Sequence, residues 1–180
     1  MIVAVAACRA FLLVVFAVAV LSKTATAARR RAFTSAVAAF GIRRALRPTA
    51  AAVVASELAA VALLCAAPAP GFTACVALLA VFTVAIARAL RTGKRVACRC
   101  FGSSGAALGP GHAVRNALLL AVAVAGAAMA AAGTGAGHID VSSWCAATIA
   151  GGAAGAVMTR WDDVAYVLGF TNRPASRGAS

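Results

Sequence analysis

The sequence predicts an all-α integral membrane protein, a bundle of four core transmembrane helices followed by a fifth C-terminal span. Hydrophobic residues make up 63% of the 180 residues, and the mean hydropathy is +0.95. Charged residues account for only 12%, whereas a soluble domain contains ~25%. Five apolar runs reach or approach the ~20 residues that a helix needs to cross the hydrocarbon core. These three observations exclude an ordinary water-soluble domain.

The basic residues lie between the apolar runs. The chain has 17 Lys and Arg against 4 Asp and Glu, a net charge of +13. In a soluble protein this charge would indicate nucleic-acid binding, but no nucleic-acid-binding motif accompanies it. Clusters that flank spans are typical of topology signals beside anionic lipid head groups. We therefore expect the lipid bilayer as a partner and no nucleic acid.

The first apolar run extends from Val3 to Leu21, with Arg9 within reach of a membrane interface. A cleaved signal peptide is the alternative, since Thr24–Ala27 offers small residues for cleavage. A signal peptide carries its positive charges before the apolar region, whereas Lys23 and Arg29–Arg31 follow it here. We therefore expect a retained helix with its N-terminus outside.

The first connection, Ser22 to Pro48, is basic and contains no acidic residue, so we expect it on the cytoplasmic side. Its middle part, Ala32–Ile42, places Phe33, Val37 and Phe40 at spacings of four and three residues. This spacing puts the three side chains on one helical face. The pattern predicts a short amphipathic helix at the membrane interface.

The second and third spans are predicted at Thr49–Ala67 and Phe72–Leu90, joined by a tight outer turn at Pro68–Gly71. Glu57 lies in the middle of the second span. Because a carboxylate at mid-membrane costs ~2.5–3.5 kcal/mol on insertion scales, Glu57 is expected to face the bundle interior and to be paired or protonated.

The C-terminal third contains the fourth span, His112–Ala132, and a weaker glycine-rich run, Trp144–Met158. Glycine permits close helix approach, so we expect a fifth helix there. The five spans and the charge bias agree on an outside N-terminus and a cytoplasmic tail in the cell membrane. The predicted division is a four-helix domain over 1–132, an outer loop with the fifth helix over 133–159, and a cytoplasmic tail over 160–180.

The second basic connection contains Cys98 and Cys100 with Arg99 between them, and we expect it on the cytoplasmic side. A thiolate is the nucleophile in disulfide exchange, and nearby cations lower the pKa of a thiol. A bridge between residues two apart would be strained and readily reduced. A metal site with His112 is a weaker alternative, because two thiols and one imidazole do not close a tetrahedral zinc shell. A third interpretation is that Cys98 and Cys100 are unreactive residues at the edge of the membrane. No bound metal is expected.

The other four cysteines, Cys8, Cys65, Cys75 and Cys145, fall in the outer half of the predicted topology. Free cysteine packs as a small apolar residue, so structural roles are favoured. A Cys65–Cys75 bridge across the turn stays open, and so does a bridge in which Cys8 or Cys145 is the partner.

The segment Cys98-Arg99-Cys100-Phe101-Gly102, a glycine-rich loop and then His112-Ala113-Val114-Arg115-Asn116 resembles the signature of the methylamine utilisation protein MauE family. These proteins are related to the DoxX-like membrane proteins. Further matches are Phe16, Ser22-Lys23, Glu57-Leu58 and Phe82. The resemblance covers about Val3 to Ala132.

The resemblance implies a four-helix membrane core with a part in thiol–disulfide chemistry. MauE itself is associated with making the disulfide-rich small subunit of methylamine dehydrogenase. Carried over to this chain, Cys98 and Cys100 would be the redox pair, and Phe101 and Gly102 would shape their loop.

Four polar residues would support the pair by the same resemblance. Arg115 and Asn116 would line the adjacent helix start, and Glu57 and Lys23 would be polar groups inside the bundle. Anchoring in lipid head groups remains the alternative for Lys23 and Arg115.

The expected function is thiol–disulfide redox chemistry or the maturation of a partner protein through the C-x-C pair. The partner would be a thioredoxin-like or disulfide-bearing protein. The cofactor is unknown. Disulfides are made on the outer side, whereas the basic residues place the pair inside, so either electrons cross the bilayer through a quinone or the outer-half cysteines, or the topology is inverted. The alternatives are a non-catalytic assembly factor that docks a partner enzyme, and a solute carrier that uses Glu57 as a proton site.

Overall fold

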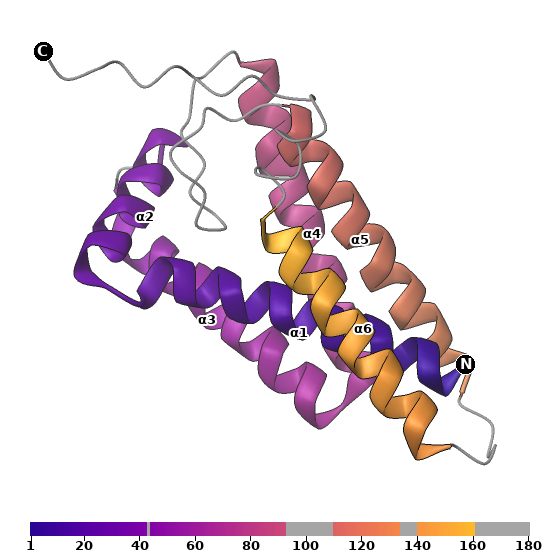
Figure 1. The fold of residues 1–180 in the computed structure, drawn as a ribbon. Helices are drawn as coiled ribbons and strands as arrows, with labels where there is room; N and C mark the ends of the chain where they lie inside the picture. Colours follow the sequence, from indigo (N-terminus) through magenta and orange to yellow (C-terminus); the bar gives the residue numbers. More distant parts are fainter. Residues whose placement is uncertain (43, 93–109, 134–139, 161–180) are drawn as a thin grey trace, which may run out of the picture.

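A computed structural model describes residues 1–42, 44–92, 110–133 and 140–160 of the chain. Within them the chain is helical and forms no strand. The helices are α1 (Ile2–Thr24), α2 (Ala27–Ala39), α3 (Leu46–Ala66), α4 (Pro68–Arg91), α5 (Pro110–Ala131) and α6 (Val141–Thr159), as Figure 1 shows. All except α2 are long and apolar enough to cross a membrane. The predicted all-α membrane fold with five spans is confirmed.

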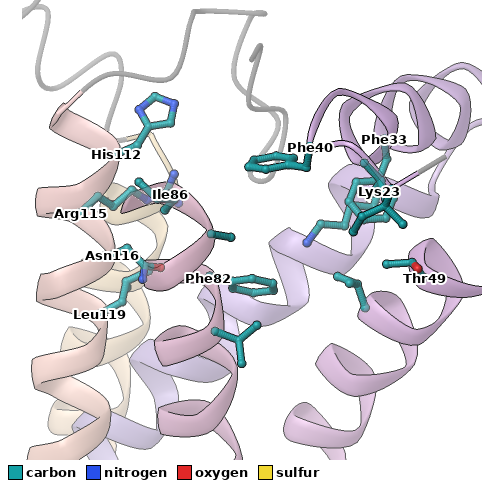
Figure 2. A pocket seen from close by; sticks show the side chains of 15 residues that line it. Lys23, Phe33, Phe40, Thr49, Phe82, Ile86, His112, Arg115, Asn116 and Leu119 are labelled. Carbon is teal, nitrogen blue, oxygen red and sulfur yellow. The ribbon is translucent and has the colours of Figure 1, made fainter. Parts of the chain in front are cut away.

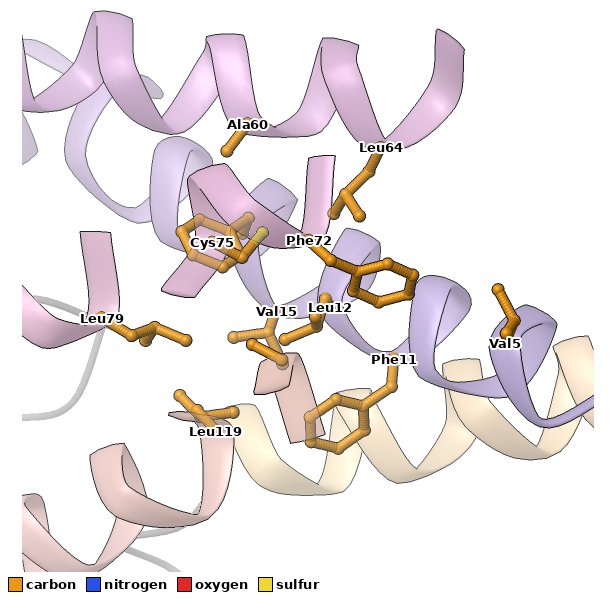
Figure 3. Close-up of a cluster of buried hydrophobic side chains, with 12 residues drawn as sticks. Val5, Phe11, Leu12, Val15, Ala60, Leu64, Phe72, Cys75, Leu79 and Leu119 are labelled. Carbon is orange, nitrogen blue, oxygen red and sulfur yellow. The ribbon is translucent and has the colours of Figure 1, made fainter. Parts of the chain in front are cut away.

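Helix α1 is the central element of the bundle, because it packs against α6, α3, α5 and α2. Its buried face includes Phe11, Leu12 and Val15. Figure 3 shows these side chains in one cluster with Phe72 of α4 and Leu119 of α5. In lipid, helices are held together by close packing and interhelical hydrogen bonds, so this cluster stabilises the bundle through van der Waals contacts between closely packed side chains.

Helix α6 lies against α1 through glycines spaced four residues apart. A Cβ at Gly151 would lie 2.1 Å from the carbonyl oxygen of Ala7, and one at Gly155 would lie 2.7 Å from that of Phe11. The predicted close approach of a fifth helix is therefore confirmed. The helix begins three residues before the predicted start at Trp144, since the Asp140 carboxylate accepts hydrogen bonds from the first backbone N–H groups.

The turn predicted at Pro68–Gly71 is wrong in its position. These residues form the first turn of α4, and only Ala67, in an extended conformation, separates α4 from α3. Proline is favoured at the first helical position because it has no N–H to leave unpaired there. Gly71 is needed for close packing, since a Cβ at this position would lie 2.6 Å from the backbone of Leu64.

The predicted amphipathic helix exists as α2, but its apolar face does not point to lipid. Phe33 and Val37 are buried and pack with Ala50 of α3. The helix starts earlier than predicted because the Thr26 side chain accepts a hydrogen bond from the backbone N–H of Arg29. Helix α2 therefore covers α1 and α3 at one end of the bundle.

The helix ends that carry basic residues lie at the same end of the bundle (Figure 1). This end contains α2, the C-terminal ends of α1 and α4, and the N-terminal ends of α3 and α5. The α1/α3 pair and the α4/α5 pair diverge there, with the N-terminus of the chain at the opposite end. Five helices therefore contribute an end or their full length to this part of the bundle.

Candidate functional site

A buried ion pair joins α1 to α3 at the basic end. The Lys23 ammonium, in the last turn of α1, donates a hydrogen bond from Nζ to Oε1 of Glu57. The two side chains are 2% and 0% exposed. Two charges are removed from solvent at a cost that only close pairing offsets, so the pair fixes how α1 and α3 lie relative to each other. The prediction that Glu57 faces the interior and is paired is confirmed.

Two aromatic rings complete the surroundings of Lys23. Its Nζ lies 5.4 Å from the ring centre of Phe33 on α2 and 5.9 Å from that of Phe82 on α4. Each cation–π contact contributes on the order of 0.5–2 kcal/mol, more when water is excluded. The second carboxylate oxygen of Glu57 is buried and has no hydrogen-bond partner among the described residues. The carboxylate is therefore held from one side only.

A second polar cluster joins α5 to α4. Asn116 is 3% exposed, and its Nδ2 donates to the carbonyl oxygen of Leu79 at 2.9 Å and to Oγ1 of Thr83 at 2.6 Å. Thr83 in turn donates to the same Leu79 carbonyl at 2.7 Å. Arg115, the residue before Asn116, is 6% exposed. Buried side-chain hydrogen bonds of this kind hold membrane helices in register.

A cavity of about 260 Å³ lies between the two clusters. Figure 2 shows Arg115 and Asn116 on one side of it and Lys23 on the opposite side, with Phe40 and Phe82 between them. Most of its wall is apolar or aromatic, and polar groups occur at a few positions. The lining residues are Lys23, Phe33, Val37, Phe40, Ile42, Thr49, Val53, Val81, Phe82, Ala85, Ile86, His112, Arg115, Asn116 and Leu119.

Of the residues that the sequence singled out, Lys23 and Glu57 pair with each other, and Arg115 and Asn116 lie on the opposite side of the cavity from Lys23. The other four, Cys98, Cys100, Phe101 and Gly102, lie outside the described residues. They belong to the stretch that joins Thr92, at the end of α4, to Pro110, at the start of α5. Both helix ends border the cavity end of the bundle (Figure 1).

Sequence reasoning missed Thr83 and the aromatic contacts of Lys23. The sequence indicates Phe33 only as part of an apolar helix face and Phe82 only as a family match, because nothing in a linear pattern shows which cation a ring will face. Thr83 falls four residues after Leu79 in the middle of a span. A hydroxyl at mid-span is a signal that could have been used, since it must find a partner in lipid.

Arg9 and the four cysteines outside the C-x-C motif are described by the structure. The Arg9 guanidinium donates to the carbonyl oxygen of Cys65, one of the last carbonyls of α3, which have no partner within their own helix. Cys8, Cys65, Cys75 and Cys145 are free thiols. Cys75 is fully buried in the core cluster while Cys65 is exposed, so the bridge considered between them is not formed.

The described helices form a five-span bundle that buries a charged pair and a hydrogen-bonded amide at one end. These features define a multi-pass membrane protein with an internal polar site. The model of the family described as methylamine utilisation protein MauE matches residues 1–129. The chain belongs to the MauE family, as the C-x-C and R-N motifs predicted. The match runs from α1 almost to the end of α5 and does not include α6. No curated protein and no solved structure matches the chain.

Proposed function

We propose that this protein takes part in thiol–disulfide chemistry through Cys98 and Cys100, and so in the maturation of a disulfide-bearing partner protein for methylamine utilisation. The family description supports the pathway. The sequence supports the chemistry, because two thiols flank Arg99 in a basic stretch and cations raise the thiolate fraction.

The observation that carries the proposal is that Lys23, which is paired with Glu57, lines one cavity together with Arg115 and Asn116 at the end of the bundle where α4 and α5 are joined. Ionisable groups inside a membrane protein are costly and mark functional sites. The C-x-C pair lies on the chain between the two helices that supply Asn116 and its partner Thr83. The polar site therefore supports the helix ends from which the thiols are tethered.

The chemistry is ordinary thiol–disulfide exchange. The thiolate of Cys98 or Cys100 attacks a disulfide sulfur of the partner, one partner thiol leaves, and a mixed disulfide forms. The second cysteine then attacks its neighbour in the mixed disulfide, which closes the C-x-C bridge and releases the reduced partner. The same steps in reverse oxidise a partner dithiol.

Orientation is part of the proposal. Basic residues gather at the cavity end, and the positive-inside rule places that end in the cytoplasm and the N-terminus outside. The described residues that carry this charge are Lys23, Arg29, Arg30, Arg31, Arg44, Arg47, Arg88, Arg91, Arg115 and Arg160. In intact cells, a membrane-impermeant thiol reagent should leave Cys98 and Cys100 unlabelled and should label them after the membrane is permeabilised.

The redox role is tested by trapping. With Cys100→Ser, a mixed disulfide formed at Cys98 cannot be resolved, so a covalent partner should accumulate and disappear on reduction. Cys145→Ser is the matched control, because Cys145 is an exposed free thiol of α6 that does not belong to the C-x-C motif. The absence of adducts with both Cys98→Ser and Cys100→Ser, together with normal growth on methylamine when both are replaced, would refute the redox role.

A non-catalytic assembly factor is the second candidate. Arg29, Arg30 and Arg31 are exposed on a helix that Phe33 and Val37 hold against the bundle, which presents a rigid basic surface to a partner enzyme. In that case Cys98→Ser would have no effect, whereas replacing the three arginines by glutamine would abolish partner binding in a pull-down.

A further inference from the structure

We propose that the cavity between Lys23 and Arg115 binds the ring of a lipid-soluble quinone. The inference rests on the proposed function, since it supplies the two-electron partner that a dithiol–disulfide pair in a membrane protein requires. It adds a ligand, a site and the residues that would hold the ligand.

The size of the cavity is the first argument. Its volume is about 260 Å³, just below the ~300–1,000 Å³ typical of pockets for drug-sized ligands. A single substituted ring fits this volume, whereas a whole phospholipid does not. A long isoprenoid tail would remain outside, along the lipid-facing surface of the helices.

The walls are the second argument. Phe33, Phe40 and Phe82 line the cavity together with branched aliphatic residues such as Ile86 and Leu119. Aromatic and aliphatic walls suit a flat, uncharged ring, which stacks on or packs edge-to-face against aromatic side chains. A phosphate group centred between these walls would lose its hydration, because the donors of Lys23 and those of Arg115 and Asn116 lie on opposite sides of the cavity. The lining therefore favours a quinone over a lipid head group.

The placement of the polar groups is the third argument. The two carbonyl oxygens of a para-quinone lie at opposite edges of the ring. Lys23 lies on one side of the cavity, and Arg115 and Asn116 lie on the opposite side (Figure 2). An ammonium group carries three N–H donors and a guanidinium group five, so hydrogen-bond donors border the cavity where both oxygens would be.

The reaction with the C-x-C pair balances. When the dithiol is oxidised, the two S–H bonds of Cys98 and Cys100 break and one S–S bond forms. The two electrons and two protons pass to the quinone, whose carbonyl oxygens become hydroxyl groups. Reduction of the bridge by a quinol is the reverse. A diffusible lipid carrier would thus connect thiols at the cytoplasmic end to electron transfer elsewhere in the membrane.

The test fills the cavity without removing a polar group. Ala85 lines the cavity, while Ala87 is exposed on the same helix and does not line it. Ala85→Phe and the control Ala87→Phe are purified into phosphatidylcholine nanodiscs and titrated with decylubiquinone. A ligand that binds the native state raises the midpoint of thermal unfolding as its concentration rises. We expect this rise in the unmodified protein and in Ala87→Phe, and binding weaker by more than about tenfold in Ala85→Phe.

Two controls keep the test decisive. Val81→Phe fills the cavity from another position on α4 and should also weaken binding if Ala85→Phe proves unstable. Decylbenzene, which has the tail and ring without carbonyl groups, should stabilise the protein much less than decylubiquinone. Equal binding to both filled variants and the unmodified protein, or stabilisation by phosphatidylglycerol in place of the quinone, would overturn the inference.

The redox state of Cys98 and Cys100 is measured in the same nanodiscs in glutathione buffers. A pair that cycles with glutathione while decylubiquinone has no effect would overturn the cavity inference and leave the proposed function intact. Binding of decylubiquinone beside a pair that never cycles would support the cavity as a binding site and overturn the proposed function.

Discussion

Replacing Glu57 by leucine is the sharpest test of the buried site. The substitution removes the carboxylate and leaves the Lys23 ammonium, which is 2% exposed, without its ion-pair partner. Breaking a buried pair in this way costs about 3–5 kcal/mol. The rings of Phe33 and Phe82 still face the ammonium at 5.4 and 5.9 Å, so we expect a loss near the lower limit, about 3 kcal/mol.

The double variant Lys23→Met/Glu57→Leu separates charge from packing. A buried pair replaced by apolar residues of similar volume is commonly neutral or more stable, by ~1–4 kcal/mol. We therefore expect the double variant to recover most of the stability that Glu57→Leu loses. Leu58→Ala is the matched control, because Leu58 neighbours Glu57 and is 51% exposed; it should change stability by less than about 0.5 kcal/mol.

The assay is thermal unfolding of the purified protein in detergent, followed by helical circular dichroism. For a chain of this size, a loss of 3 kcal/mol lowers the midpoint by roughly 6–12 °C. The loss of stability in the double variant is compared with the sum of the losses in Lys23→Met and in Glu57→Leu. Equality of the two would refute the reasoning, because additive losses show that the two charges do not interact.

Three further predictions concern the packing of single helices. Gly151→Ala should destabilise the fold by about 1–3 kcal/mol, because the added methyl group would push α6 away from α1. Gly152→Ala should be tolerated, because its Cβ would meet only a side-chain methyl group at 3.9 Å. Equal effects of the two substitutions in thermal unfolding would contradict this packing. Asn116→Leu removes two interhelical hydrogen bonds and should cost about 0.6–1.7 kcal/mol in the same assay; an unchanged midpoint would show that these bonds do not hold α5. Hydrogen bonds donated by the residues after Asp140 lower the pKa of its carboxyl from its ordinary value of 3.8, so its stabilisation of α6 is present above that value and lost as pH falls through the lowered pKa. Asp140→Asn should remove this acid-dependent component of stability, and a pH profile identical to that of the unmodified protein would contradict the capping role.

The five spans followed from the sequence because membrane thickness sets the length of an apolar run, whatever its neighbours are. The interior position of Glu57 followed in the same way, since no lipid-facing carboxylate is stable at mid-span. The glycines of the fifth helix indicated close approach, and Gly151 and Gly155 lie against α1. Each of these inferences depends on one residue or one run and on the properties of the bilayer.

The pairings between helices could not be predicted in this way. Lys23 stands 34 residues before Glu57, and whether the two meet depends on the relative rotation and depth of α1 and α3. The apolar face of α2 is equally compatible with lipid and with a helix, and packing against Ala50 decides it. The Pro68–Gly71 segment contained turn residues, but proline also starts helices. The cavity arises only from the combined geometry of five helices.

The central claim is that Cys98 and Cys100 form a redox pair. The most direct test measures the oxidation state of these two cysteines at controlled redox potentials. In a variant with Cys8, Cys65, Cys75 and Cys145 replaced by alanine, the remaining thiols are equilibrated with glutathione buffers, trapped with acid and alkylated. Mass spectrometry then separates the doubly alkylated dithiol from the unmodified bridge. We predict a reversible two-electron transition between the two forms across the series. A single form at every ratio of reduced to oxidised glutathione would contradict the account.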